Sequence, residues 1–373
     1  MRYRALDAWR GLAALFVAVF HFDEAHQAFY LGAFVTQSYL FVDFFFVLSG
    51  LVISLTYAER IRQPGEAGRF VLRRIGRLWP LHVVMLGAMI ADSLFRGRTV
   101  ETDLFTADGL NPILTNLALV QSLGFHDRLT FNLPSWSIST EFYVYLLFMV
   151  IALAPRRLIP ALSAACVLIG VGVVLAFSKL WLCTTYDWGF FRCMYGFFLG
   201  YFVFKTLEGK REKVPGGTWL EVLAIVGVGA YLVVQGGPDV SPLSLIAPLV
   251  FVPVILVFAT ESGAVSWLLK ARPLQHLGEL SYSLYMVHVF VLAIFRQTRE
   301  FLSDVTGIDL GPGRIAAGVL DYPGLRIALS LMLYLAMVIA LSHVTYYLVE
   351  RPGRDFFNRL ASRPRLPRPA TLD

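Results

Sequence analysis

The stretch from residue 4 to residue 30 reads RALDAWRGLAALFVAVFHFDEAHQAFY and places ionisable side chains within a long apolar run. Arg10 and His21 are eleven residues apart, close to a whole number of turns at about 3.6 residues each, so both fall on one helical face together with Asp7. Ionisable groups in a span cost about 2.5–3.5 kcal/mol each on insertion scales, so they normally face protein or a wet cavity. The sequence therefore predicts a first transmembrane helix whose polar stripe points inward.

The composition indicates that many more such helices follow. Hydrophobic residues make up 57% of the 373 residues and charged ones 16%. Apolar stretches of about 20 residues recur along the chain and are separated by basic or Gly- and Pro-containing loops, a pattern typical of multi-pass helical membrane proteins. We therefore expect an all-α transmembrane bundle of about ten spans.

The expected spans and domains can be placed by residue number. The spans cover residues 7–29, 39–57, 79–95, 135–153, 158–177, 190–204, 219–234, 242–259, 280–295 and 323–348. The apolar piece at 113–125 is too short to cross a membrane and is expected to be interfacial or re-entrant. Residues 1–350 are expected to form one membrane domain, and residues 351–373 a basic cytoplasmic tail.

The net charge of +6 is explained by topology rather than by nucleic-acid binding. Basic clusters follow every second expected span, including residues 60–77 and the C-terminal tail. The positive-inside rule places such clusters in the cytoplasm, so both termini are expected to be cytoplasmic.

Three titratable residues on three expected helices are predicted to lie at a similar depth. Counting about 1.5 Å per residue puts His21 about 9 Å below the outer edge of a core of about 30 Å. The same count from the outer side brings Glu141 and Asp43 close to that level. Histidine titrates near neutrality, at a pKa of about 6.5, and can take up and return a proton when a carboxylate orients it. Mutual structural pairing of His21 and Glu141 is the alternative.

Arginines are predicted at the opposite, inner level. Arg73, Arg74 and Arg77 lie at the start of the third expected span, and Arg10 lies at the inner end of the first. Arg74 and Arg77 are one helical turn apart and could bind one phosphate group together, although membrane topology alone would also place basic residues there.

Further candidates for the wall of an inward-facing cavity are Tyr143 in the fourth expected span and Tyr285 and His288 in the ninth. Asp7, on the stripe of the first span, belongs with them. No spacing of His, Cys, Asp or Glu suggests a metal site.

Six stretches, taken in order, read LDAWRGLAALFVAVFHF, DFFFVLSGLVIS, RRIGRLWP, PSWSISTEFYVYLLF, LGELSYSLYMVH and VERP. In their order and content they resemble the acyltransferase-3 family of integral-membrane acyltransferases, over almost the whole chain. The family's Arg-x10-His pattern matches Arg10 and His21, and its Arg-x-x-Arg pattern matches Arg74 and Arg77. Its glutamate, at the start of the Ser- and Trp-containing span, matches Glu141.

The resemblance implies an O-acyltransferase of the bacterial inner membrane. Acyl-CoA, most simply acetyl-CoA, would be the donor co-substrate, with no tightly bound cofactor. The arginines would hold it from the cytoplasm, and His21 would act as the base for a hydroxyl of a sugar or lipid-linked acceptor at the outer side.

Two other functions can be weighed against this one: a transporter, which would also need inward-facing charges, and an inactive scaffold, which would not. A secondary transporter or proton-coupled flippase would need similar residues, but commonly shows two repeated halves with broken helices, which this sequence lacks. A membrane scaffold without activity would have no use for the polar stripe of the first span.

Overall fold

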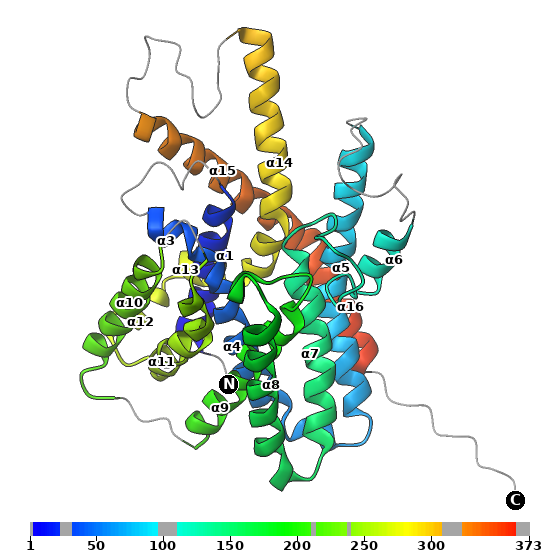
Figure 1. The fold of residues 1–373 in the computed structure, drawn as a ribbon, viewed down its shortest axis with the longest axis vertical. Coiled ribbons are helices and arrows are strands. Elements are labelled where there is room, and N and C mark those ends of the chain that lie inside the picture. The colour runs from blue at the N-terminus through cyan, green and yellow to red at the C-terminus, as the bar shows by residue number, and fades with distance from the viewer. Residues whose placement is uncertain are drawn as a thin grey trace, which may run out of the picture.

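The computed structural model describes residues 3–22, 32–95, 110–209, 214–236, 240–307 and 323–362. Helices make up nearly all of these segments, and none of the described residues lies in a strand, which confirms the all-α prediction. Figure 1 shows α1 and α4 in the middle of the bundle, with α10, α11 and α12 to one side and α5, α7 and α16 to the other.

The elements follow one another in a single run along the chain. They are α1 Arg4–His21, α3 Gly32–Thr36, η1 Ser38–Leu40, α4 Phe41–Tyr57, η2 Arg60–Arg62, α5 Glu66–Phe95, α6 Asn111–Leu117, α7 Ser135–Leu153, η3 Arg156–Leu158, α8 Ile159–Phe177, η4 Trp181–Cys183, α9 Gly189–Leu207, α10 Gly217–Val234, η5 Pro242–Ile246, α11 Ala247–Thr260, α12 Ala264–Leu269, α13 Arg272–Glu279, α14 Ser281–Thr306, α15 Pro323–Thr345, the π-helical turn η6 Tyr346–Glu350, and α16 Arg351–Ser362.

Seven helical segments in the described part of the chain are long and apolar enough to cross a membrane. They are Gly32–Tyr57, Glu66–Phe95, Ser135–Leu153, Arg156–Phe177, Gly217–Val234, Pro242–Thr260 and Ile327–Ser362. Helices α13 and α14, bent by 69° at their junction, would make an eighth span. The chain is therefore a multi-pass helical membrane protein.

Two of the ten expected spans correspond to helices that are not among those candidates. They are α1 and α9, which form helices of 18 and 19 residues. Both lie inside the bundle: α1 contacts α4, α13 and α14, and α9 contacts α4, α7, α8 and α11. A helix surrounded by other helices can carry charged side chains that a lipid-facing helix cannot, because its neighbours supply their partners.

Close packing of α4 against α9 forms the most extensive helix pair. Gly50 and Gly200 face each other there: a Cβ on Gly200 would lie 2.0 Å from the carbonyl oxygen of Val47, and one on Gly50 would lie 1.8 Å from that of Phe197. Small residues at membrane helix interfaces let backbones approach in this way.

The expected re-entrant piece at 113–125 is a short helix followed by irregular chain. Helix α6 ends at Leu117, and turns continue to the start of α7 at Ser135. The indole nitrogen of Trp79 donates to the carbonyl oxygen of Leu117 at 2.9 Å, and the hydroxyl of Tyr143 donates to that of Ala118 at 3.1 Å. Side chains of α5 and α7 thus donate hydrogen bonds to backbone carbonyl groups of a segment that is too short to cross the membrane.

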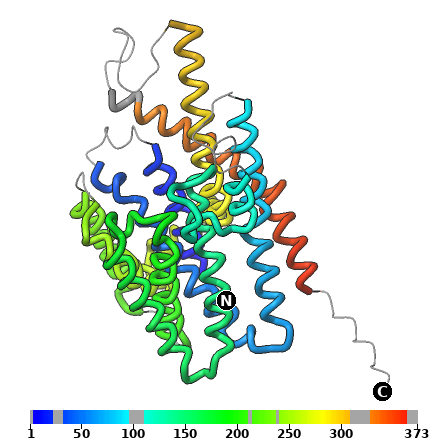
Figure 2. The backbone as a smooth tube through the Cα atoms, turned by 45° about the vertical axis from the view of Figure 1, so that its right-hand side comes forward, coloured from blue at the N-terminus to red at the C-terminus, as the bar shows by residue number. Residues whose placement is uncertain are grey.

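The first part of the predicted tail is a helix that packs on the membrane domain. Helices α15, η6 and α16 follow without a break, and Figure 2 shows the red end of the tube beside the blue-to-cyan path of α5. Gly76 of α5 approaches Phe357, and Gly353 of α16 approaches Pro80, so closely that a Cβ at either glycine would clash. Residues 363–373, the rest of the predicted tail, lie outside the described residues.

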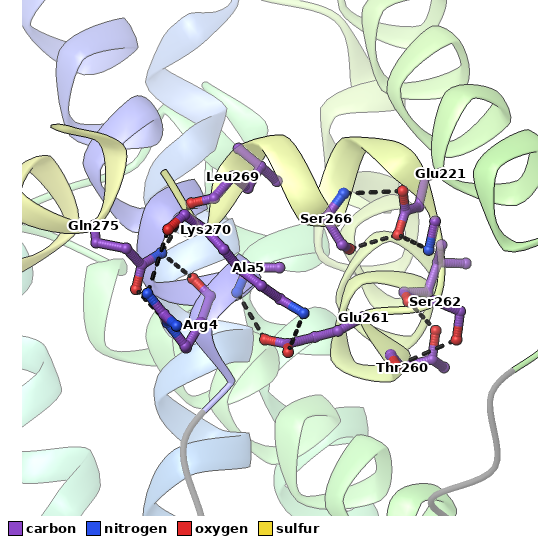
Figure 3. Close-up of polar contacts among 12 residues, drawn as sticks. Arg4, Ala5, Glu221, Thr260, Glu261, Ser262, Ser266, Leu269, Lys270 and Gln275 are labelled. Atoms are coloured by element: carbon purple, nitrogen blue, oxygen red, sulfur yellow. Dashed lines mark hydrogen bonds and ion pairs between the residues drawn. The ribbon is translucent and has the colours of Figure 1, made fainter. Parts of the chain in front are cut away.

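Two buried or partly buried carboxylates fix the start of α1 and the short helix α12 (Figure 3). Glu261 accepts from the backbone nitrogen of Ala5 at 2.9 Å and pairs with Lys270 at 2.8 Å. Glu221, fully buried in α10, accepts from the backbone nitrogens of Gly263 and Ser266 at 2.9 and 3.0 Å. Each carboxylate thereby satisfies backbone donors at a helix start, where such donors lack partners within the helix.

Replacing Gly200 with alanine is expected to destabilise the protein, because the new methyl group would overlap the backbone of α4. Overpacking of this kind costs about 1–3 kcal/mol. Thermal unfolding of the purified protein in detergent should show a lower Tm for Gly200→Ala. The matched control is Gly227→Ala on α10, where a Cβ meets nothing within 4 Å and the Tm should not fall. Equal transition temperatures for both variants would contradict the packing.

Candidate functional site

A cavity of about 420 Å³ opens between α1, α4, α5, α7 and the α13–α14 junction. Its charged lining consists of Asp7, Arg10, Arg74, Arg77, Glu141, Glu279 and Arg354. Its apolar lining includes Val42, Phe45, Phe46, Ile138 and the ring of Tyr285. The cavity thus has the mixed wall expected for a ligand with a polar, anionic part and an apolar part.

Two residues of the predicted polar stripe of α1, Asp7 and Arg10, face this cavity, whereas the third, His21, does not line it. Arg10 donates to the Ser281 hydroxyl at 2.9 Å and lies 3.5 Å from the carboxylate of Asp7. Both residues line the cavity. The polar cavity and the contact between Asp7 and Arg10 lower the free-energy cost of placing two charges within a span.

Arg74 has no carboxylate partner in the described part of the chain. Its guanidinium lies over the rings of Tyr57, Phe70 and Tyr145, at 5.5, 5.8 and 5.6 Å from their centroids. Its Nε is buried without a hydrogen-bond partner. Aromatic faces stabilise the cation while leaving its N–H groups available to an anion in the cavity.

Arg77 differs from Arg74, because its guanidinium forms an ion pair with Glu350. Glu350, only 1% exposed, also accepts from the Ser283 hydroxyl at 2.7 Å. The Arg77 guanidinium lies 5.1 Å from the centroid of the Tyr282 ring. Arg77 is therefore held between α14 and η6.

The first turn of α14 binds three different neighbours in succession. Ser281 accepts from Arg10 of α1, Tyr282 donates to the carbonyl oxygen of Leu78 in α5, and Ser283 donates to Glu350 of η6. The sharp bend between α13 and α14 exposes this turn to all three elements. It therefore sets the geometry of the arginine-rich end of the cavity.

Arg73 points away from this group. It shares the carboxylate of Glu66 with Arg60 and Arg69, at distances of 3.3, 2.6 and 2.8 Å, and it does not line the cavity. Successive residues of a helix point about 100° apart, and here Arg74 faces the cavity while Arg73 faces Glu66. The prediction that Arg73 contributes to phosphate binding is not supported by this placement.

Glu141 lies in the same cavity as the arginines, not beside His21. Its carboxylate accepts from the hydroxyl of Tyr145 at 2.6 Å, and that hydroxyl is 2.9 Å from the Ser49 hydroxyl. The expectation that Glu141 directly orients His21 is thus corrected, because counting depth along a helix does not say which way a side chain turns.

Asp43 does not orient His21 either, because its carboxylate pairs with Arg192. Both of its oxygens accept from Arg192 of α9, at 3.0 and 2.7 Å, and the two side chains are 0% and 1% exposed. Arg192 also donates to the carbonyl oxygen of Thr184 and lies 5.2 Å from the ring centroid of Trp136. Asp43 therefore belongs to a dry ion pair that joins α4 to α9, and not to the predicted catalytic group.

His288 is the partner that the structure gives His21 instead. Nε2 of His288 lies 3.2 Å from Nδ1 of His21, and that Nδ1 is 2.9 Å from the carbonyl oxygen of Val17. A carbonyl oxygen only accepts, so the contact with Val17 favours the tautomer of His21 with the proton on Nδ1 and the lone pair on Nε2. The hydroxyl of Tyr334 lies near the carbonyl oxygens of both Ala18 and His288, at 3.3 and 3.2 Å, and joins α1 to α14 at this level.

Tyr285 lies between the cavity and the histidine pair. Its ring packs against Phe45 and His288, with centroids 6.0 and 5.8 Å apart, and its hydroxyl is 2.8 Å from that of Ser137. Tyr143, by contrast, does not line the cavity and contacts the segment after α6. The predicted residues thus divide into a cavity group, a histidine pair reached through Tyr285, and Arg73, Asp43 and Tyr143 outside both.

Several residues that complete this arrangement were not singled out from the sequence. Arg192 could have been noticed, because a lone arginine in an apolar stretch carries the same cost as Arg10. Glu350 lies in the stretch VERP, but nothing local links it to Arg77, 273 residues earlier. Nothing in the sequence distinguishes Tyr145 and Tyr334 from other tyrosines in apolar spans.

Comparison with known proteins identifies the family to which this arrangement belongs. The acyltransferase-3 model, described as "Acyltransferase domain", matches residues 3–347. The chain belongs to the acyltransferase-3 family. This acyltransferase-3 chain is 25% identical to "Putative membrane-bound transacylase BcsY" of Komagataeibacter xylinus, over 96% of its own length and 84% of that protein.

A second relative of the acyltransferase-3 chain is "Acyltransferase MdmB" of Streptomyces mycarofaciens, 29% identical over 100% of this chain and 96% of that protein. "Protein 2 in picA locus" of Rhizobium radiobacter is 37% identical over a shorter region, 24% of this chain and 45% of that protein. No solved structure matches the chain.

Asp43→Asn is expected to lower the stability of this acyltransferase more than its activity per folded molecule. Breaking a buried ion pair by removing one partner costs about 3–5 kcal/mol, because the other charge stays buried. The Tm in detergent should drop, and Asp43→Asn combined with Arg192→Met should recover part of the loss. Glu59→Gln, which breaks an exposed ion pair with Arg156, is the control and should leave the Tm nearly unchanged. If Asp43→Asn lost activity with an unchanged Tm, Asp43 would instead have the catalytic role predicted from the sequence.

Proposed function

We propose that this acyltransferase moves a short acyl group, most simply acetyl, from acyl-CoA to a hydroxyl group of an acceptor. The observation that carries the proposal is that one residue, Tyr285, contacts both the arginine-lined cavity and the histidine pair. One cavity begins among arginines and ends at Tyr285, whose ring contacts His288, and His288 in turn contacts His21. The anion-binding cavity and the proton-accepting histidine pair are therefore neighbours in the structure.

The arginine-rich end suits the phosphate groups of CoA. Guanidinium groups bind phosphates through charge-assisted hydrogen bonds, and Arg10, Arg74 and Arg354 all line this end of the cavity. A cavity of about 420 Å³ is of the size that small ligands occupy, so it would hold the narrow thioester arm, with the phosphates near the arginines. The positive-inside rule assigns this end to the cytoplasm, where acyl-CoA is found.

His21 would supply the proton transfer. Its Nε2 takes the proton from the acceptor hydroxyl as the hydroxyl oxygen attacks the thioester carbonyl carbon. The carbon–sulfur bond then breaks, and the CoA thiolate leaves with the proton that His21 returns. Contact with Val17 and His288 keeps the ring of His21 in one orientation throughout.

The acceptor side is proposed by analogy and by position. Both long relatives are named as acyl-transferring proteins of bacteria, one of them membrane-bound. A sugar or a lipid-linked hydroxyl presented from the outer side of the bacterial inner membrane would meet the histidine pair opposite the arginines. Membrane lipid surrounds the protein, and no nucleic acid takes part.

His21→Ala is expected to lower acyl transfer by about 10²- to 10⁴-fold, the usual contribution of a positioned general base. The measurement is transfer of radiolabelled acetyl from acetyl-CoA into glycan and lipid fractions, using membranes with equal amounts of folded protein. The CoA-binding constant should change little, because His21 does not line the arginine-rich cavity.

The control is His343→Ala, an exposed histidine whose ring contacts His276 and Tyr347 away from the cavity. It should keep the activity of the unmodified protein. Turnover by His21→Ala close to that of the unmodified protein would rule out the role proposed for His21.

A further inference from the structure

The arginines of the cavity differ in whether a carboxylate neutralises their charge. Arg10 lies beside Asp7, and Arg77 is paired with Glu350. Arg74 lies over three aromatic rings, and none of the described carboxylates forms an ion pair with it. Of the two α5 arginines in the cavity, an incoming phosphate therefore meets Arg74 without an ion-pair partner and Arg77 with one.

We propose that Glu350 is a positioning residue that keeps Arg77 as a neutralised part of the cavity wall, and that Arg74 is the arginine of α5 that binds the donor's phosphate groups. This division of roles rests on the proposed function, in which an acyl-CoA is the donor. It separates two arginines that the Arg-x-x-Arg spacing makes look equivalent.

The position of Glu350 supports this role. Glu350 is the last residue of η6, a π-helical turn within an otherwise continuous helix from α15 to α16. Such turns are rare, and they often lie at functional sites, because the wider turn redirects the side chains that follow. Here both carboxylate oxygens are used, one by Arg77 and one by Ser283, and the side chain is almost completely buried.

The surroundings of Arg77 explain why its guanidinium pairs with Glu350 and is not available to a ligand. Its side chain is 21% exposed, it packs over the Tyr282 ring, and it joins α5 to η6 and α14. Removing Glu350 would leave this cation beside the cavity without a counter-ion. It would then bind an anion from the cavity instead, and the donor would gain a second guanidinium.

The proposal predicts opposite effects of two single substitutions on CoA binding. Arg74→Met should weaken binding about tenfold or more, because charge-assisted hydrogen bonds to phosphate are lost. Glu350→Gln should strengthen it about three- to tenfold, because Arg77 becomes free. Binding is measured by isothermal titration of the purified full-length protein in detergent with CoA.

The double variant Arg77→Met/Glu350→Gln removes the pair without leaving a charge behind. Its CoA-binding constant should stay within about twofold of that of the unmodified protein. Should this variant fail to fold, the two single substitutions still carry the test, because their predicted effects have opposite signs.

Two controls separate this role from a general loss of charge or stability. Arg69→Met removes an arginine of α5 that pairs with Glu66 outside the cavity. Glu221→Gln removes a buried carboxylate that caps α12. Arg69→Met should leave the CoA-binding constant unchanged, and Glu221→Gln should lower the Tm without strengthening CoA binding.

The proposal is overturned if Glu350→Gln fails to strengthen CoA binding, or if the double variant weakens it as much as Arg74→Met does. Failure of the proposed donor gives a different result. If the unmodified protein binds inorganic pyrophosphate but not CoA, the donor assignment falls, and the same variants are compared with pyrophosphate. Binding of neither anion overturns both proposals.

Discussion

The structure depends on one constraint: a charged side chain within a membrane span must have a partner or face a wet cavity. The described helices meet it in two ways. Asp43 and Arg192 form a dry pair in which the two guanidinium–carboxylate bonds satisfy both groups. Arg10, Arg74 and Arg77 face a cavity, where water or a ligand can solvate whatever charge their neighbours leave. The first arrangement stabilises the bundle, and the second makes a binding site.

The same constraint explains which helices occupy the interior. Helices α1 and α9 carry Arg10 and Arg192 within their apolar stretches and are enclosed by their neighbours, whereas α8 has no charged residue and exposes apolar side chains. Glycines at 50 and 200 bring α4 and α9 close enough for Asp43 to reach Arg192. Close backbone packing and a buried ion pair are therefore found at the same interface.

The sequence was sufficient to predict the all-α class. It was also sufficient to select charged residues within apolar spans, because such residues are costly in a membrane and need a function or a partner. Arg10, Arg74, Arg77 and Glu141 could be selected by that cost and by family resemblance, and one cavity is lined by all four. The partners could not be selected, because they depend on contacts between distant segments. Glu350 meets Arg77, and Arg192 meets Asp43, across 273 and 149 residues. The direction of a side chain around its helix was not predictable from a count of residues, which is why Glu141 and Asp43 were assigned to His21.

Helix α14 connects the two ends of the proposed reaction. Ser281, Tyr285 and His288 recur at intervals of four and three residues, so they share one face of the helix. Along that face Ser281 contacts Arg10, Tyr285 contacts Ser137 at the apolar end of the cavity, and His288 contacts His21. Since Arg10 and His21 themselves share one face of α1, two neighbouring helices meet at both levels. A rigid pair of this kind fixes the distance between the anion-binding end and the histidine pair, and positioning of that kind can supply much of the barrier reduction in a transfer between two bound substrates.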